Sequence, residues 1–137
     1  MIRFFEEGNI RLTNKRLIKN WLTSCVESEG KYLQDINFVF CNDDELLDKN
    51  IKYLKHNTLT DVITFDYSEN DLISGEVYIS VDRIQENASL LNVKFSDELN
   101  RVMIHGVLHL LGYTDKTKLE KVEMRKKEDD YLALRNF

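Results

Sequence analysis

Residues 104–115, IHGVLHLLGYTD, place two histidines in an apolar stretch, and such a stretch predicts a buried helix. Side chains at positions i and i+4 share a helix face, so His105 and His109 can bind one ion. Gly112 favours a helix end and a turn, after which Asp115 can return to the histidine face. The spacing predicts a metal site made of these three side chains. The alternative is two core histidines that are hydrogen-bonded to the backbone or to a carboxylate.

The residue after the first histidine argues against one class of metal enzyme. Zinc peptidases carry H-E-x-x-H, in which the glutamate acts as general base. Gly106 occupies that place here and cannot accept a proton. We interpret this glycine as making room beside the metal. Hydrolysis of peptides or small esters by a zinc-dependent enzyme is therefore disfavoured, and we retain it as an alternative.

Length and composition indicate one globular unit. The 137 residues predict a single domain, 1–137, in which 42% hydrophobic residues form the core and 31% charged residues cover it. No apolar run approaches the roughly 20 residues that cross a bilayer, so we expect no membrane partner. The first residues do not resemble a signal peptide, and Cys25 and Cys41 form no C-x-x-C pattern, so we expect a cytoplasmic protein with reduced thiols. The net charge of −5 disfavours a broad nucleic-acid binder but permits a local basic groove.

Hydrophobic periodicity predicts an alternation of strands and helices. Short apolar runs predict strands at 2–5, 36–41, 61–65 and from 75 to about 80. Helical periodicity predicts helices over 17–26, 43–54, 82–93, 97–111 and 118–134, with Asn42 and Ser96 as caps of the second and fourth. This order predicts an α+β fold: a small mixed four-stranded sheet with about five helices packed against it and the metal site on a central buried helix.

Three segments resemble one known family. Residues 105–113, HGVLHLLGY, are similar to the H-G-x-L-H-L-x-G-Y-D-H signature of the YbeY proteins, endoribonucleases of ribosomal RNA maturation. Residues 60–65, TDVITF, resemble the family's T-D-V-L-S-F strand, and residues 75–80, GEVYIS, resemble its G-D-I-x-I-S strand. The resemblance implies a cytoplasmic enzyme that holds one Zn²⁺ ion and cleaves single-stranded RNA. It also implies a role in maturing the 3′ end of small-subunit rRNA and in ribosome quality control, with the rRNA precursor and the small ribosomal subunit as partners.

The chain departs from the family pattern at two functional positions. The third ligand position holds Asp115 in place of histidine. A carboxylate is an acceptable zinc ligand, and it also admits a harder divalent metal such as manganese. The arginine that the family usually carries seven residues before the aspartate of T-D-V is Leu54 here, and leucine cannot clamp a phosphate. We predict the neighbouring Lys55 as the catalytic cation in its place.

Contacts with RNA are predicted in the irregular segment before the third strand. Lys55, His56 and Thr60 are the candidates, and an ordinary polar loop is the alternative reading. The basic residues between 116 and 127 can extend this surface, but their interleaving with Glu120, Glu123 and Glu128 favours a solvated helix face. A third functional alternative is a non-catalytic ribosome-associated factor with a structural metal. Structural zinc has four protein ligands and catalytic zinc keeps one position open, so three candidate ligands favour catalysis.

Overall fold

The computed structural model describes residues 1–7, 10–56 and 60–137, and these contain a four-stranded mixed sheet. The strands are β1 (Ile2–Glu6), β2 (Tyr32–Cys41), β3 (Val62–Asp66) and β4 (Leu72–Ser80), and their spatial order is β1-β2-β4-β3. β2 pairs in parallel with both β1 and β4, whereas β3 pairs antiparallel with β4. The predicted mixed sheet is therefore confirmed.

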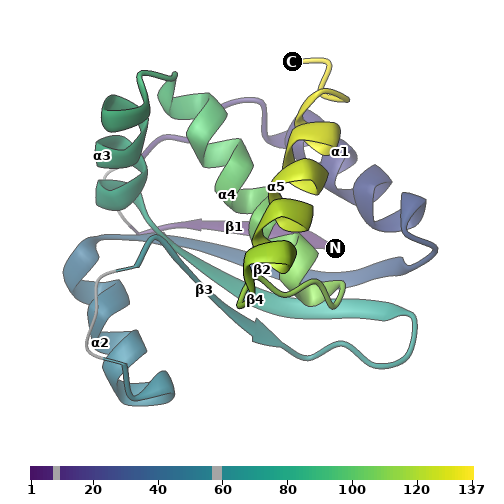
Figure 1. Ribbon diagram of the computed structural model, residues 1–137, viewed down its shortest axis with the longest axis horizontal. Coiled ribbons are helices and arrows are strands. Elements are labelled where there is room, and N and C mark those ends of the chain that lie inside the picture. The colour runs from purple at the N-terminus through teal and green to yellow at the C-terminus, as the bar shows by residue number, and fades with distance from the viewer. Residues whose placement is uncertain (8–9, 57–59) are drawn as a thin grey trace.

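Five helices in the described residues cover this sheet. They are α1 (Lys15–Ser28), α2 (Asp43–Leu54), α3 (Val81–Leu91), α4 (Phe95–Leu110) and α5 (Lys118–Leu132). α1, α4 and α5 lie on one side of the sheet, and α2 lies on the other (Figure 1). α4 is the central helix because it contacts β3, β4 and three helices, α1, α3 and α5. The predicted α+β architecture is confirmed.

α4 lies close to the sheet because two glycines face the contact. A Cβ atom on Gly106 would lie 2.7 Å from Cγ1 of Val77 in β4. A Cβ atom on Gly75 in β4 would lie 2.7 Å from Cδ2 of Leu110 in α4. Both distances are shorter than a van der Waals contact. The interpretation that Gly106 makes room beside the metal was wrong: successive helix residues point about 100° apart, and this one faces the sheet.

Several element ends differ from the predictions. α4 begins at Phe95, and Ser96 does not cap it, because the N-cap position is Lys94 without a side-chain hydrogen bond. β2 begins at Tyr32, four residues before the predicted start, because its first residues pair with the early residues of β4. The cap at Asn42 is confirmed, since its side-chain oxygen accepts a hydrogen bond from the Glu45 amide at 2.8 Å. These ends depend on strand pairing and packing more than on local sequence.

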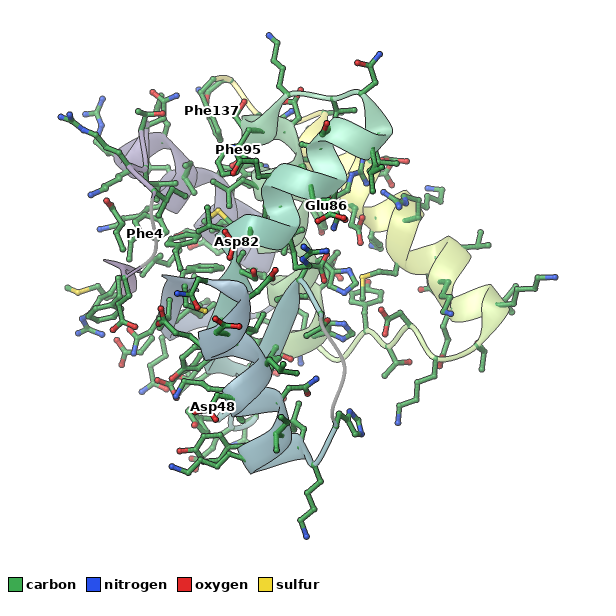
Figure 2. The ribbon with its side chains drawn as sticks, turned by 90° about the vertical axis from the view of Figure 1, so that its left-hand side faces the viewer. Phe4, Asp48, Asp82, Glu86, Phe95 and Phe137 are labelled. Atoms are coloured by element: carbon green, nitrogen blue, oxygen red, sulfur yellow. The ribbon has the colours of Figure 1, made fainter. Side chains whose placement is uncertain are left out.

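α2 and α3 are joined through the first turn of each helix. The Asp43 amide donates to the Asp82 carboxylate at 3.0 Å, and the Arg83 guanidinium donates to the Asp43 carboxylate at 3.0 Å. In Figure 2, Asp82 lies near the start of α2, while Asp48 lies further along that helix. The contacts fix the start of α2, the helix whose far end reaches the candidate site.

Both cysteines have the buried environment of core residues. Cys25 and Cys41 are both free and buried. Burial raises the pKa of each thiol to about 12, which keeps both protonated at neutral pH. Among the described residues, no helix combines the length and apolar character that a bilayer crossing demands.

Candidate metal centre

The C-terminal end of α4 brings the three predicted ligands together. The Nε2 atoms of His105 and His109 lie 2.9 Å apart, one helical turn from each other. The Asp115 carboxylate lies 3.4 Å from Nε2 of His105 and 3.7 Å from Nε2 of His109. Across the described parts of the chain, these three form the one group of His, Cys, Asp or Glu side chains close enough to share an ion.

A turn at the end of α4 returns the aspartate to the histidines. Gly112 has a φ of 103°, in the region that glycine adopts readily and other residues rarely adopt. The Tyr113 amide donates to the Leu108 carbonyl at 3.0 Å, and the Gly112 amide donates to the His109 carbonyl at 3.0 Å. These bonds close the helix in the way that glycine-terminated helices commonly do. The predicted glycine stop is confirmed.

The outer nitrogens of both imidazoles donate to oxygen acceptors. Nδ1 of His105 lies 2.7 Å from the Glu128 carboxylate, and Nδ1 of His109 lies 3.0 Å from the backbone carbonyl of Tyr113. A carbonyl and an ionised carboxylate can only accept, so each Nδ1 carries a proton. In a neutral ring the Nε2 atom is then an unprotonated acceptor.

This arrangement fits a bound cation. Two Nε2 lone pairs and one carboxylate converge on a common point, and their mutual repulsion is relieved when a positive charge lies between them. Two imidazole nitrogens and one carboxylate oxygen form a ligand set that Zn²⁺ accepts. The residues at this place therefore fit a divalent metal, for which the described residues supply three ligands.

The same contacts shift the pKa values of the two histidines in opposite directions. Burial lowers the pKa of His105, but the hydrogen bond and charge of Glu128 outweigh it, and the net pKa is raised. Burial and the neighbouring His105 lower the pKa of His109. The two rings thus differ in environment. The Glu128 carboxylate lies next to Nδ1 of His105, and the neutral Tyr113 carbonyl lies next to Nδ1 of His109.

A cleft of about 360 Å³ lies beside the three ligands. Its other walls come from the end of α2, from the segment before β3 and from β3 itself; they include Asn50, Leu54, His56, Thr60, Asp61 and Thr64. Of the three predicted RNA-contact residues, His56 and Thr60 line the cleft. Lys55 is the C-cap of α2, with a φ of 57° and an exposed side chain, and it lies outside the cleft lining. Among the described lining residues there is no lysine or arginine.

Sequence reasoning missed two carboxylates near the ligands. Asp61 lines the cleft, and burial raises its pKa. Glu128, predicted on a solvated face, is instead buried with 5% of its surface exposed. The reason is that one face of α5 packs against the core, and Met124 and Tyr131 lie on that face. Their spacing of four and three residues from Glu128 is the signal that could have found it.

Comparison with known proteins assigns the family. The family model described as Endoribonuclease YbeY matches residues 4–136. The chain belongs to the YbeY family. The sequence prediction of this family is confirmed, and the signature residues 105–113 correspond to the end of α4 and the turn that follows.

Individual YbeY relatives match over nearly the full chain. An Endoribonuclease YbeY from Christiangramia forsetii is 45% identical over 133 residues, which cover 97% of this chain and 93% of the relative. One from Amoebophilus asiaticus is 50% identical over 130 residues, which cover 94% and 88%. The solution structure of TM1509 from Thermotoga maritima is 32% identical, with a TM-score of 0.69, and the match covers 96% of this chain and 87% of that one. This structural likeness agrees with the α+β fold.

Proposed function

We propose that this chain is a metal-dependent endoribonuclease that cleaves single-stranded RNA during the processing of ribosomal RNA. Two observations support the proposal: membership of the endoribonuclease YbeY family, and the convergence of His105, His109 and Asp115 beside a cleft. The convergence carries most weight because it comes from three side chains whose contacts are independent of the family assignment.

In the proposed site, His105 and His109 would hold a zinc ion through their Nε2 atoms, and Asp115 would hold it through a carboxylate oxygen. When bound, the ion would supply positive charge for the scissile phosphate and Lewis acidity. Glu128 and the Tyr113 carbonyl keep the protons of the two imidazoles on Nδ1, away from the ion. Three protein ligands with an open position are typical of catalytic zinc, so the structure of the site favours catalysis over a purely structural metal.

The cleft is the proposed RNA-binding surface. His56 and Thr60 line it and can donate hydrogen bonds to RNA, and we retain Lys55, which is exposed between the lining residues Leu54 and His56 in the sequence, as a candidate cation. Leu54 lines the wall where the family usually has an arginine, so the described part of this wall offers an apolar contact in place of a phosphate clamp. We therefore expect charge stabilisation of the phosphate to depend chiefly on the metal.

Peptide hydrolysis is the weaker alternative. Gly106 faces Val77 across a gap that does not accommodate even a Cβ atom without movement. A glutamate at this position, which zinc peptidases use as general base, would not fit against the sheet. We expect no cleavage of casein by the purified protein.

The cellular assignments are further proposals that rest on the family resemblance. We propose residues 1–137 as one catalytic domain, the rRNA precursor and the small ribosomal subunit as partners, and the cytoplasm as its location. Cells depleted of this protein should then accumulate small-subunit rRNA with unprocessed 3′ ends. Normal 3′ ends after depletion would contradict this part of the proposal.

The central test compares metal content and RNA cleavage in matched variants. The wild-type protein should contain about one zinc ion per chain by elemental analysis and should cleave single-stranded RNA in a chelator-sensitive reaction. The double variant His105→Ala/His109→Ala should lose both properties, whereas His56→Ala, from the same cleft, should retain the metal. Equal metal content in wild type and double variant, or cleavage that chelators leave unchanged, would overturn the proposal.

A further inference from the structure

Glu128 is a charged side chain buried between α4 and α5. It is 5% exposed, and its two carboxylate oxygens contact different side chains; Oε1 also lies 3.6 Å from Nη1 of Arg125 in α5. Oε2 lies 2.7 Å from Nδ1 of His105, and Oε1 lies 2.9 Å from Nη1 of Arg101. Both partners belong to α4, one turn apart. The carboxylate therefore reaches from α5 to the back of one proposed metal ligand and is held in place by a cation.

A simpler explanation is that Glu128 only attaches α5 to α4. The structure offers other contacts for that purpose. Nη2 of Arg101 lies 2.7 Å from the Asp129 carboxylate, so α5 retains an ion pair with the same arginine without Glu128. Met124 and Tyr131 are buried on the same face of α5 and pack in the main core. The hydrogen bond that Nδ1 of His105 donates to Oε2 of Glu128 is thus an addition to the attachment of α5.

We propose that Glu128 is a positioning residue that sets the metal affinity of the site by orienting His105. This inference rests on the metal site of the proposed function. The carboxylate holds the proton of His105 on Nδ1 and turns Nε2 toward His109 and Asp115. Arg101 holds the carboxylate in turn.

The physical basis is the effect of an outer carboxylate on a metal-binding imidazole. A carboxylate that accepts from one ring nitrogen fixes the ring and increases the basicity of the other nitrogen. Loss of such a partner typically weakens metal binding about 10- to 100-fold. His109 has a backbone carbonyl in the equivalent place, which no side-chain substitution removes. Substitution of Glu128 therefore changes the support of one ligand only.

The test measures metal affinity in two neighbouring variants. Glu128→Gln retains the shape of the side chain and removes its charge, and Asp129→Asn removes the second ion pair of Arg101 without touching His105. Affinity for Zn²⁺ is measured by competition with a chromophoric chelator, and the Co²⁺-loaded proteins are compared by visible absorption. Circular dichroism of the metal-free proteins checks the fold.

We expect Glu128→Gln to weaken Zn²⁺ binding about 10- to 100-fold and to alter the Co²⁺ spectrum, with Asp129→Asn within about twofold of wild type. Equal affinity in wild type and Glu128→Gln would overturn the inference while leaving the metal site intact. Equal weakening in both variants would also overturn it, because attachment of α5 would then be the cause. A wild-type protein that binds no metal would overturn the proposed function itself.

A measurement on the wild-type protein alone applies even if Glu128→Gln does not fold. In the zinc-loaded protein, long-range proton–nitrogen NMR spectra of His105 should show a protonated Nδ1 and a metal-bound Nε2. The reverse arrangement, with the metal on Nδ1, would overturn the inference, because the Glu128 carboxylate would then have no proton to accept.

Discussion

The Nε2 atoms of His105 and His109 lie 2.9 Å apart, and each ring is held from behind by a different oxygen acceptor. Two Zn–N bonds of about 2.0–2.1 Å at tetrahedral angles place the nitrogens about 3.3 Å apart. The observed separation is close to the one that a shared zinc ion would require, and both rings are oriented by their oxygen acceptors.

Asp115 should control which metal the site prefers. Asp115→His replaces an oxygen ligand with the imidazole that the family signature carries at this position. Imidazole suits zinc, whereas carboxylate oxygen also suits manganese. We expect this variant to retain Zn²⁺ and to lose affinity for Mn²⁺ relative to Zn²⁺, as measured by competition between the two ions. An unchanged ratio of affinities would show that Asp115 does not contact the metal. Asp115→Ala, the control without a third ligand, should bind both ions more weakly.

Because Gly106 lies against Val77, the effect of Gly106→Ala on the free energy of unfolding should depend on the residue at position 77. In Gly106→Ala the new methyl group would meet Cγ1 of Val77 at 2.7 Å. Overpacking costs about 1–3 kcal/mol, which exceeds the helix-propensity gain of at most about 1 kcal/mol. We expect the free energy of unfolding in urea to fall by about 1–2 kcal/mol. In a Val77→Ala background the same substitution should be neutral or stabilising, and equal destabilisation in both backgrounds would refute the close contact.

Replacing Leu54 with arginine should strengthen RNA binding. Leu54→Arg places a guanidinium on the cleft wall, where it can pair with a phosphate. We expect tighter binding of single-stranded RNA and a salt dependence steeper by about 0.7 in the log–log slope, the contribution of one phosphate contact. Ile51→Arg is the matched control, because Ile51 is exposed on the same helix and lies outside the cleft lining. The same steepening in both variants would indicate a general charge effect, and the cleft would not be the binding surface.

The Glu29 carboxylate should contribute to the free energy of unfolding at neutral pH and lose this contribution in acid. Burial raises the pKa of Glu29, but hydrogen bonds from Tyr113, Tyr131 and Lys127 outweigh it and lower the net pKa. A carboxyl whose folded pKa is depressed stabilises the fold above its unfolded pKa of about 4.3 and loses that contribution as the pH falls through the folded value. Glu29→Gln should therefore lower the free energy of unfolding at pH 7 by about 1.5–3 kcal/mol.

The same variant should converge with wild type in acid. Urea titrations at pH 7, 5, 4 and 3 should show the difference shrinking only below about pH 4.3, where the carboxylate of the unfolded chain becomes protonated. A difference that is constant down to pH 3 would show that ionisation of Glu29 does not contribute. Tyr113, which Glu29 holds at 2.6 Å, also provides the carbonyl behind His109, so zinc affinity is a useful second readout.

The amino-acid sequence by itself determined the features that depend on local spacing. The four-residue interval between His105 and His109 places both on one helix face, and Gly112 permits the left-handed turn that returns Asp115. Alternation and helical periodicity were enough to predict four strands, five helices and a mixed sheet. The assignment of the three side chains as metal ligands stays a prediction, although the structure brings them together.

Only the tertiary structure decided which face of each element is covered. Glu128 is buried because α5 packs against α4, Gly106 faces β4, and Leu54 and Asp61 line a cleft that Lys55 does not line. Each of these facts depends on an element distant along the chain. The period of a helix shows which residues share a face, but its orientation is set by the apolar surface that its neighbours offer, and that surface exists only once they have assembled.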